Sequence, residues 1–261
     1  MLLTVCICKY EDAARRPLIE KIWPNKVLFP DSVGKLSYFI GLYTYITRDN
    51  GESWEGPHLI SDSYIIRGQC VELPDGTVLA PAYDVLDKSG TTQAAVFASR
   101  DRGRTWAPYA FLSGPQSEGH SADEPTLVRT ASGRIVAFIR TPHGMYYCHS
   151  NDDGLNFTEP TATDFPASVP YHALRLPDGR VWLSYGHRAE PYGIRAVILD
   201  SDCGDISREN ELILRDDGVS LDLSYTSAAL LPDGDILTVY YHCTRESNEQ
   251  RHIAGTVVRA S

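Results

Sequence analysis

The sequence predicts an all-β fold, a β-propeller built from four-stranded antiparallel units. Three observations predict it: a turn phrase that recurs about every fifty residues, a second turn phrase between its copies, and a scarcity of helix-forming segments. The chain has 261 residues, of which 43% are hydrophobic and 22% charged, so it can bury a full core. We expect a single propeller domain over residues 1–261.

The first turn phrase has the form Ser/Thr-x-Asp-x-Gly-x-x-aromatic. Its copies are TRDNGESW (Thr47 to Trp54), SRDRGRTW (Ser99 to Trp106), SNDDGLNF (Ser150 to Phe157) and a degenerate DSDCGDIS (Asp200 to Ser207). The central aspartates lie 101 − 49 = 52, 152 − 101 = 51 and 202 − 152 = 50 residues apart. An Asp side chain accepts backbone hydrogen bonds in such a turn, and the Gly supplies a positive φ. We expect the rings of Trp54, Trp106 and Phe157 to be buried at equivalent places.

The second turn phrase lies between copies of the first. It occurs as LPDG at 73–76, 176–179 and 231–234 and as TASG at 130–133, and β-type runs such as TVLAPAYD and DILTVYYH follow it. Each unit therefore contains a strand, a PDG turn, a strand, a loop, a strand, an Asp turn and a last strand.

Both ends of the chain depart from this repeat. MLLTVCICKY reads as the second strand of a first unit that lacks its innermost strand, and HIAGTVVRAS reads as the third strand of the last unit. We therefore expect about five visible blades, the first and last of them incomplete, in a propeller that is shortened at its N-terminus. The modest helix candidate is the segment from Glu11 to Ile22, which Pro17 interrupts.

Composition narrows the partners and the compartment. The net charge of 24 − 34 = −10 argues against nucleic acid or an anionic membrane as the main partner. The apolar start lacks a basic lead and a small-residue cleavage site, so we interpret it as a strand and not as a signal peptide or membrane span. The six cysteines form no CxxC pair and no cluster with His, which favours free thiols, a cytoplasmic location and no metal or cofactor; they are Cys6, Cys8, Cys70, Cys148, Cys203 and Cys243.

Polar residues occur where a propeller exposes its channel. The inner strand of each unit lines the channel, and its first residues lie at the mouth where ligands bind. Arg140 ends the second strand of its unit, 140 − 124 = 16 residues after Glu124. Arg188 and Arg195 flank the loop RAEPYGIR. At the inner-strand positions stand Arg67, Glu124, His172 and Tyr225.

The Asp turns, EPTLVRTASGRIVAFIR and SYTSAALLPDGDILTVYY together resemble the exo-α-sialidase (neuraminidase) superfamily, whose members are six-bladed propellers with Asp-box or BNR repeats. The resemblance implies a six-bladed propeller that lacks its N-terminal blade. The resemblance implies that Tyr225 is the nucleophile, that Glu124 is its proton-accepting partner and that Arg140 is the second arginine of a three-arginine carboxylate clamp. It implies Arg195 as the third arginine, with Arg188 as the alternative. The first arginine and the acid/base Asp of the family have no match, and Arg67 and His172 are further substrate-binding candidates.

These residue types suit a sugar whose anomeric carbon carries a carboxylate. A carboxylate nucleophile would be repelled there, whereas a phenol is not, and arginines bind carboxylates through paired charge-assisted hydrogen bonds. We expect an exo-α-sialidase-like hydrolase that removes a terminal sialic acid or related anionic sugar from a glycan. The alternatives are a catalytically inactive Asp-box propeller that acts as a carbohydrate-binding or interaction module, and a sialidase-fold enzyme that acts on another sugar. We expect Tyr225, Glu124, Arg140 and Arg195 to meet at one end of the channel.

Overall fold

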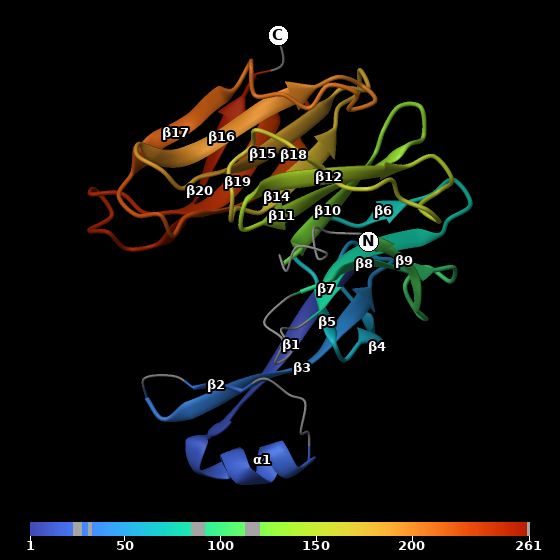
Figure 1. The fold of residues 1–261 in the computed structure, drawn as a ribbon, viewed down its shortest axis with the longest axis vertical. Helices are drawn as coiled ribbons and strands as arrows, with labels where there is room; N and C mark the ends of the chain where they lie inside the picture. The colour runs from blue at the N-terminus through green and yellow to red at the C-terminus, as the bar shows by residue number, and fades with distance from the viewer. Residues whose placement is uncertain (23–27, 31–32, 85–91, 113–120, 260–261) are drawn as a thin grey trace.

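A computed structural model describes residues 1–22, 28–30, 33–84, 92–112 and 121–259. Nearly all regular structure in these residues is β, in five antiparallel sheets that succeed one another along the chain, from blue to red in Figure 1. We name them sheets A to E in that order. The fold is a β-propeller of five blades, as the turn phrases predicted.

Each sheet takes its strands from one stretch of sequence. Sheet A contains β1 (Leu2–Asp12), β2 (Phe29–Pro30), β3 (Lys35–Ile46) and β4 (Glu55–Ser61). Sheet B contains β5 (Tyr64–Ile65), β6 (Val71–Glu72), β7 (Val78–Asp84), β8 (Ala94–Ser99) and β9 (Ala107–Leu112). Sheet C contains β10 (Asp123–Arg129), β11 (Ile135–Thr141), β12 (Gly144–Ser150) and β13 (Thr161–Ala162). Sheet D contains β14 (Tyr171–Arg175), β15 (Val181–His187), β16 (Tyr192–Leu199) and β17 (Leu212–Gly218), and sheet E contains β18 (Ser224–Leu230), β19 (Ile236–His242) and β20 (His252–Val258).

The two terminal sheets differ from the repeat, as expected. In sheet A, β3 pairs with β1, β2 and β4, and sheet E has three strands among the described residues. The described residues form five sheets, so the sixth blade stays a prediction.

Helical structure lies between β1 and β3. A 3₁₀ turn at Ala13–Arg15 leads into α1 (Arg16–Ile22), and the Asp12 carboxylate caps the turn by accepting a 2.9 Å bond from the Ala14 N–H. Pro17 does not interrupt the helix. It lies in the first turn of α1, where a missing N–H costs no helical bond. In the part of the chain that the structure describes, no helix has the length and apolar character needed to cross a membrane.

The PDG turns join the first and second strands of the units. In each, the Gly N–H donates to the carbonyl three residues earlier, at 2.9 Å for Gly76 and Leu73 and for Gly234 and Leu231. The four turn glycines have φ between 85° and 95°, a region that other residues enter only with strain. The repeated phrase therefore encodes one backbone geometry four times.

The Asp turns join the third strand to the fourth. In the second copy, the Asp101 carboxylate accepts bonds from the Thr105 N–H at 2.8 Å and from the hydroxyls of Ser99 and Thr105 at 2.8 and 2.6 Å. In the degenerate copy, Asp200 takes the place of the Ser or Thr. Its carboxylate accepts bonds from the N–H groups of Asp202, Gly204 and Asp205. The hydrogen bonds to the first residue of the turn are thus retained, whereas Gly204, unlike Gly103, does not have a positive φ.

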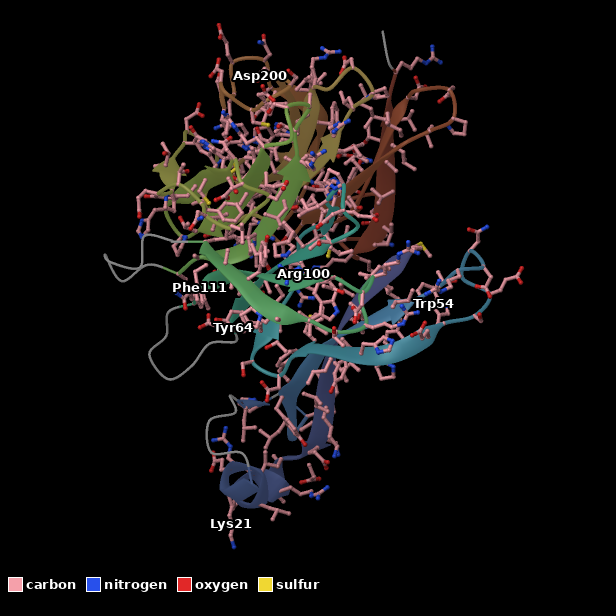
Figure 2. All side chains as sticks on the ribbon, turned by 90° about the vertical axis from the view of Figure 1, so that its right-hand side faces the viewer. Lys21, Trp54, Tyr64, Arg100, Phe111 and Asp200 are labelled. Carbon is pink, nitrogen blue, oxygen red and sulfur yellow. The ribbon has the colours of Figure 1, made fainter. Side chains whose placement is uncertain are left out.

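The aromatic residues of the Asp turns are not equally buried. Trp106 and Phe157 are partly buried and pack against the core, but Trp54 is 40% exposed and lies at the edge of the molecule (Figure 2). The prediction of equal burial was wrong for Trp54. The local turn is nevertheless the same, because Trp54 and Trp106 each donate their indole N–H to the Gly carbonyl three residues earlier. The burial of the aromatic ring therefore depends on which side chains of the neighbouring sheet pack against it.

The core lies between consecutive sheets. Phe39 and Leu42 of sheet A pack against sheet B, and Leu79 and Val96 of sheet B pack against sheet C. Phe138 of sheet C meets sheet D, and Trp182 of sheet D meets sheet E. Because each strand alternates its side chains, one sheet can pack on both neighbours. The stack brings inner strands of different sheets side by side.

Candidate active site

Glu124 stands on a bulge in the inner strand of sheet C. From Asp123 to Thr126 strand β10 advances three residues, while its partner β11 goes back two, from Arg140 to Phe138. Glu124 has φ 46°, which is uncommon for a non-glycine residue. The extra residue turns the Glu124 side chain out of the ordinary strand alternation.

Tyr225 occupies the same place in sheet E. From Ser224 to Ser227 strand β18 advances three residues, while β19 goes back two, from Tyr241 to Val239. Tyr225 also has φ 46°. Two sheets therefore present one reactive residue each through the same backbone device.

The two side chains meet although they are 101 residues apart. The Tyr225 hydroxyl donates to Glu124 Oε1 at 2.5 Å, and Arg140 Nη1 donates to Glu124 Oε2 at 2.5 Å. Glu124 is 5% exposed, whereas Tyr225 is 38% exposed. The carboxylate is thus buried and held from both sides, and the phenol faces solvent.

Sheet B brings a second arginine to the pair. The segment after Arg67 lies against the β10 bulge: the Gln69 N–H donates to Thr126 Oγ1 at 3.1 Å, and a Cβ on Gly68 would lie 1.8 Å from the Pro125 carbonyl oxygen. Only glycine permits this approach. The Arg67 charge acts on both Tyr225 and Glu124, so two guanidinium groups lie near the pair.

A cavity of about 480 Å³ opens beside the pair, where sheets A, B and C meet. Its wall combines apolar groups of β1 and β3 with charged groups of sheets B and C. The charged side chains that line it are Arg67, Asp84, Asp123, Glu124 and Arg140, and Tyr83 lines it as well. It is large enough for one sugar ring with substituents.

Burial and neighbouring charges set the proton affinity of the site. Burial, followed by the hydrogen bond and negative charge of Glu124, raises the pKa of Tyr225, and Arg140 and Arg67 oppose the rise. At neutral pH Tyr225 is therefore a phenol with its proton directed at Glu124. Burial also raises the pKa of the Asp123 carboxyl, against the hydrogen bond from Thr92 and the charge of Arg140.

Arg195 does not join this group, contrary to expectation. It lies in β16, the third strand of sheet D, where Ile213 of β17 is its register partner. Its guanidinium is buried and donates to the carbonyls of Ile194 and Arg215, and its Nε lies 3.8 Å from Glu211 Oε2. A third strand is too far from the axis to reach the channel, so Arg195 holds the outer part of sheet D together.

Arg188 lies nearer to the site. Its Nε and Nη2 donate to the Leu223 carbonyl at 3.3 and 3.2 Å, two residues before Tyr225, and its Nη1 donates to the Ser168 carbonyl at 3.0 Å. His172 lines the inner strand of sheet D and its Nε2 lies 3.3 Å from the Ala228 carbonyl of sheet E. The structure thus brings Glu124, Tyr225, Arg140 and Arg67 together and places Arg188 and His172 along the neighbouring strands.

Tyr83 and Asp123 belong to the site but were not among the predicted residues. Burial, followed by the negative charge of Glu124, raises the pKa of Tyr83 above its usual range, and Arg67 opposes this rise. The repeat of the units could have identified both residues. Tyr83 ends the second strand of its unit, as Arg140 does, and pairs with Ile65 as Arg140 pairs with Asp123. All six cysteines are free thiols, and Cys8 is exposed at the cavity wall.

Known proteins of similar fold include both uncharacterised and enzymatic examples. A protein of unknown function from Dyadobacter fermentans DSM 18053 is 30% identical with a TM-score of 0.85, covering 98% of this chain and 72% of its own. A NanB sialidase variant from Streptococcus pneumoniae is 15% identical with a TM-score of 0.61, covering 90% and 41%. An α-L-arabinanase from Penicillium chrysogenum is 17% identical with a TM-score of 0.57, covering 93% and 82%. None of the curated proteins matches this chain significantly.

The fold is a propeller with BNR-type repeats, and solved sialidase structures share this fold. The model of the BNR repeat-like domain family matches residues 27–246, and the chain belongs to that family.

Proposed function

We propose that this protein is a retaining exo-glycosidase of sialidase type, acting on a terminal sialic acid or a related anionic sugar of a glycan. The observation that carries the proposal is the 2.5 Å bond from the Tyr225 hydroxyl to Glu124, itself bound by Arg140. A phenol with an adjacent carboxylate is a nucleophile with its base, since the carboxylate takes the phenol proton during attack.

The first half-reaction forms a bond from Tyr225 Oη to the anomeric carbon and breaks the bond from that carbon to the leaving oxygen. The phenol proton passes to Glu124, and an acid protonates the leaving oxygen. Asp123 suits this second role because it lines the cavity and because Thr92 Oγ1, which binds its Oδ1, is a hydroxyl compatible with either protonation state. In the second half-reaction the water oxygen forms a bond to the anomeric carbon, and the bond from that carbon to Tyr225 Oη breaks. Asp123 takes a proton from the water, and Glu124 returns its proton to the Tyr225 oxygen.

The charges around the pair support an anionic sugar. Arg67 and Arg140 lie on the cavity wall, and Arg140 retains donors beyond the one that binds Glu124. A carboxylate on the sugar would bind them through charge-assisted hydrogen bonds. An uncharged sugar would form neither of these charge-assisted bonds, so it would bind less tightly.

A propeller that binds carbohydrate without cleaving it is the second candidate. One observation favours it: the guanidinium groups of Arg188 and Arg195, the two arginines considered for completing the clamp, are both engaged by backbone carbonyls. A site with two available arginines would hold an anionic sugar less firmly than a site with three.

The test combines turnover with trapping of the intermediate. Purified protein is assayed on fluorogenic α-sialosides, β-glucuronides and neutral aryl glycosides, and is treated with a 3-fluorosialyl fluoride. The proposal expects turnover of sialosides and a glycosyl adduct on Tyr225, located by peptide mass spectrometry. Turnover of the β-glucuronides alone would change the proposed substrate from a sialoside to a uronide, but the proposed roles of Tyr225 and Glu124 would remain.

Two results would contradict the enzymatic proposal. An adduct on a residue other than Tyr225 would remove the nucleophile assignment. Sialic acid binding in titration calorimetry, without turnover or adduct on any substrate, would establish the binding propeller instead.

A further inference from the structure

The ring of Tyr225 is covered on one side by a second tyrosine. Tyr241 stacks on it with ring centroids 6.0 Å apart and an interplanar angle of 29°. The two residues come from neighbouring strands of sheet E, because Ser224 of β18 pairs with Tyr241 of β19. Tyr225 itself is 38% exposed and has a left-handed backbone, so ordinary strand packing does not fix its ring.

Tyr241 is itself anchored. Its hydroxyl donates to Asp222 Oδ1 at 2.5 Å, and Arg251 Nη2 lies 2.5 Å from Asp222 Oδ2. Arg188 acts on both Tyr241 and Asp222 with its positive charge, and it also binds the Leu223 carbonyl. The loop before β18 and the end of β19 are therefore tied together beside Tyr225.

Sheet C contains the matching arrangement. Arg140 pairs with Asp123, as Tyr241 pairs with Ser224, and each partner is the residue before the left-handed one. Arg140 holds the Glu124 carboxylate through a hydrogen bond. The corresponding position on the second strand of sheet E therefore bears a residue that contacts Tyr225.

We propose that Tyr241 is a positioning residue for the Tyr225 phenol, with Asp222 anchoring Tyr241. This inference rests on the proposed function for its effect on catalysis. Tyr241 restricts rotation of the Tyr225 ring, so the hydroxyl stays directed at Glu124, which lines the cavity. Tyr241 takes no part in bond formation, since its hydroxyl donates to Asp222. Burial and then the Asp222 bond raise the pKa of Tyr241 to about 12, which keeps that hydroxyl protonated as a donor.

The test uses three variants and one control. Tyr241→Leu removes the stacked ring, whereas Tyr241→Phe and Asp222→Asn keep the ring and remove or weaken its anchor. The control is Tyr240→Phe: Tyr240 is the preceding residue of β19, is buried and bonds Thr256 at 2.6 Å. Thermal melting shows which variants fold. If Tyr241→Leu fails to fold, the other two variants carry the test.

The first readout does not depend on activity. In protein labelled with ¹³Cζ-tyrosine, the Tyr225 resonance is assigned by its loss in Tyr225→Phe, and its shift reports the bond to Glu124. We expect this resonance to move in Tyr241→Leu and, less, in Tyr241→Phe and Asp222→Asn, but not in Tyr240→Phe. An unmoved resonance in all three variants overturns the inference.

The second readout is turnover of an aryl sialoside. Misplacing a reacting atom by about 1 Å can lower the rate about 100-fold, so Tyr241→Leu should lower kcat about 10- to 100-fold with KM within about threefold. An unchanged kcat, or an equal loss in Tyr240→Phe, overturns the inference alone. A wild type that cleaves no glycoside contradicts the proposed function, while the resonance still decides the positioning role.

Discussion

Two sets of Tyr, Glu and Arg side chains occur in this molecule. Beside the cavity, Tyr225 donates to Glu124, which Arg140 also binds. In sheet D, Tyr185 donates to Glu211, and Arg208 binds the same carboxylate at 2.9 Å. The chemistry of the two sets is alike, but Tyr185 is fully buried between Phe165 and Tyr171, whereas Tyr225 is 38% exposed.

The difference lies in access and backbone. Tyr185 stands on the regular strand β15, so its ring enters the core between sheets C and D. Tyr225 stands on a bulge, so its ring leaves the strand alternation and its hydroxyl reaches a carboxylate of another sheet. A hydrogen-bonded set of Tyr, Glu and Arg side chains therefore has only a structural role where it is buried. It can act on a ligand only where the backbone exposes it.

The largest effect expected is on activity when the two phenols are removed separately. Tyr225→Phe should lower turnover of sialosides about 10⁴-fold or more without changing the fold, because it removes the proposed nucleophilic oxygen. Tyr185→Phe should leave turnover within about threefold and cost about 1–2 kcal/mol of unfolding free energy, because the partly buried Glu211 carboxylate loses a hydrogen-bond donor. Initial rates and urea unfolding measure both. Similar rates for the two variants would end the distinction between the sets.

The next largest effect concerns Asp123, the proposed general acid, which has no counterpart role in the set formed by Tyr185, Glu211 and Arg208. Asp123→Asn should lower kcat/KM about 10²- to 10³-fold on a sialyl oligosaccharide and far less on an aryl sialoside, whose leaving group needs little protonation. Asp84→Asn is the matched control, because Asp84 lines the same cavity but accepts a bond from the Gln93 N–H, which favours the charged form. If Asp84→Asn gives the selective loss instead, the acid assignment moves to Asp84.

A smaller effect should appear where the two sets are physically linked. Gly186 follows Tyr185, and a Cβ placed on it would lie 2.4 Å from the Ser224 Cβ, next to Tyr225. Gly186→Ala should therefore cost about 1–3 kcal/mol of unfolding free energy through overpacking, and it should lower turnover by displacing β18. Gly204→Ala, with its nearest neighbour atom at 3.8 Å, is the control for the added methyl group. Equal stability of the two variants would contradict the close approach.

The smallest expected effect is on the pH dependence of stability. It arises from an Asp turn of the scaffold and not from either set of Tyr, Glu and Arg side chains. Hydrogen bonds from Ser150 and Asn156 lower the pKa of Asp152 to about 2. Its ordinary pKa in an unfolded chain is about 3.9, so the charged form stabilises the fold above pH 4, and that contribution is lost as the pH falls from about 4 to about 2. Urea midpoints across this range should show Asp152→Asn less stable than wild type at pH 7, with a difference that shrinks on acidification. A difference independent of pH would contradict this origin.

The sequence predicted the scaffold well because the turn phrases act locally. Each PDG or Asp turn encodes its own hydrogen bonds within about six residues, so the period of the Asp turns was enough to predict the sheets. The meeting of Glu124 with Tyr225 and Arg140 was also predictable, since inner strands of successive sheets converge.

The remaining site residues depend on contacts between sheets. Arg195 and Arg188 both flank one loop, and only the strand register places Arg195 on the outer side of sheet D. Arg67 reaches the pair because Gly68 lies against Pro125, a contact that no local pattern encodes. Tyr83 and Asp123 could have been found by comparing equivalent positions of the units, as their register with Ile65 and Arg140 indicates.

The bulges in β10 and β18 make the cavity sensitive to chain length as well as to residue type. At each bulge the inner strand has one residue more than its partner strand. This extra residue decides whether odd or even positions of the strand face the site. Deleting Pro125 or Thr226 would restore regular pairing and turn Glu124 or Tyr225 away, although every side chain of the site would still be encoded. Blades of this kind can therefore gain or lose chemistry by a single-codon insertion or deletion, without any exchange of the reactive amino acids.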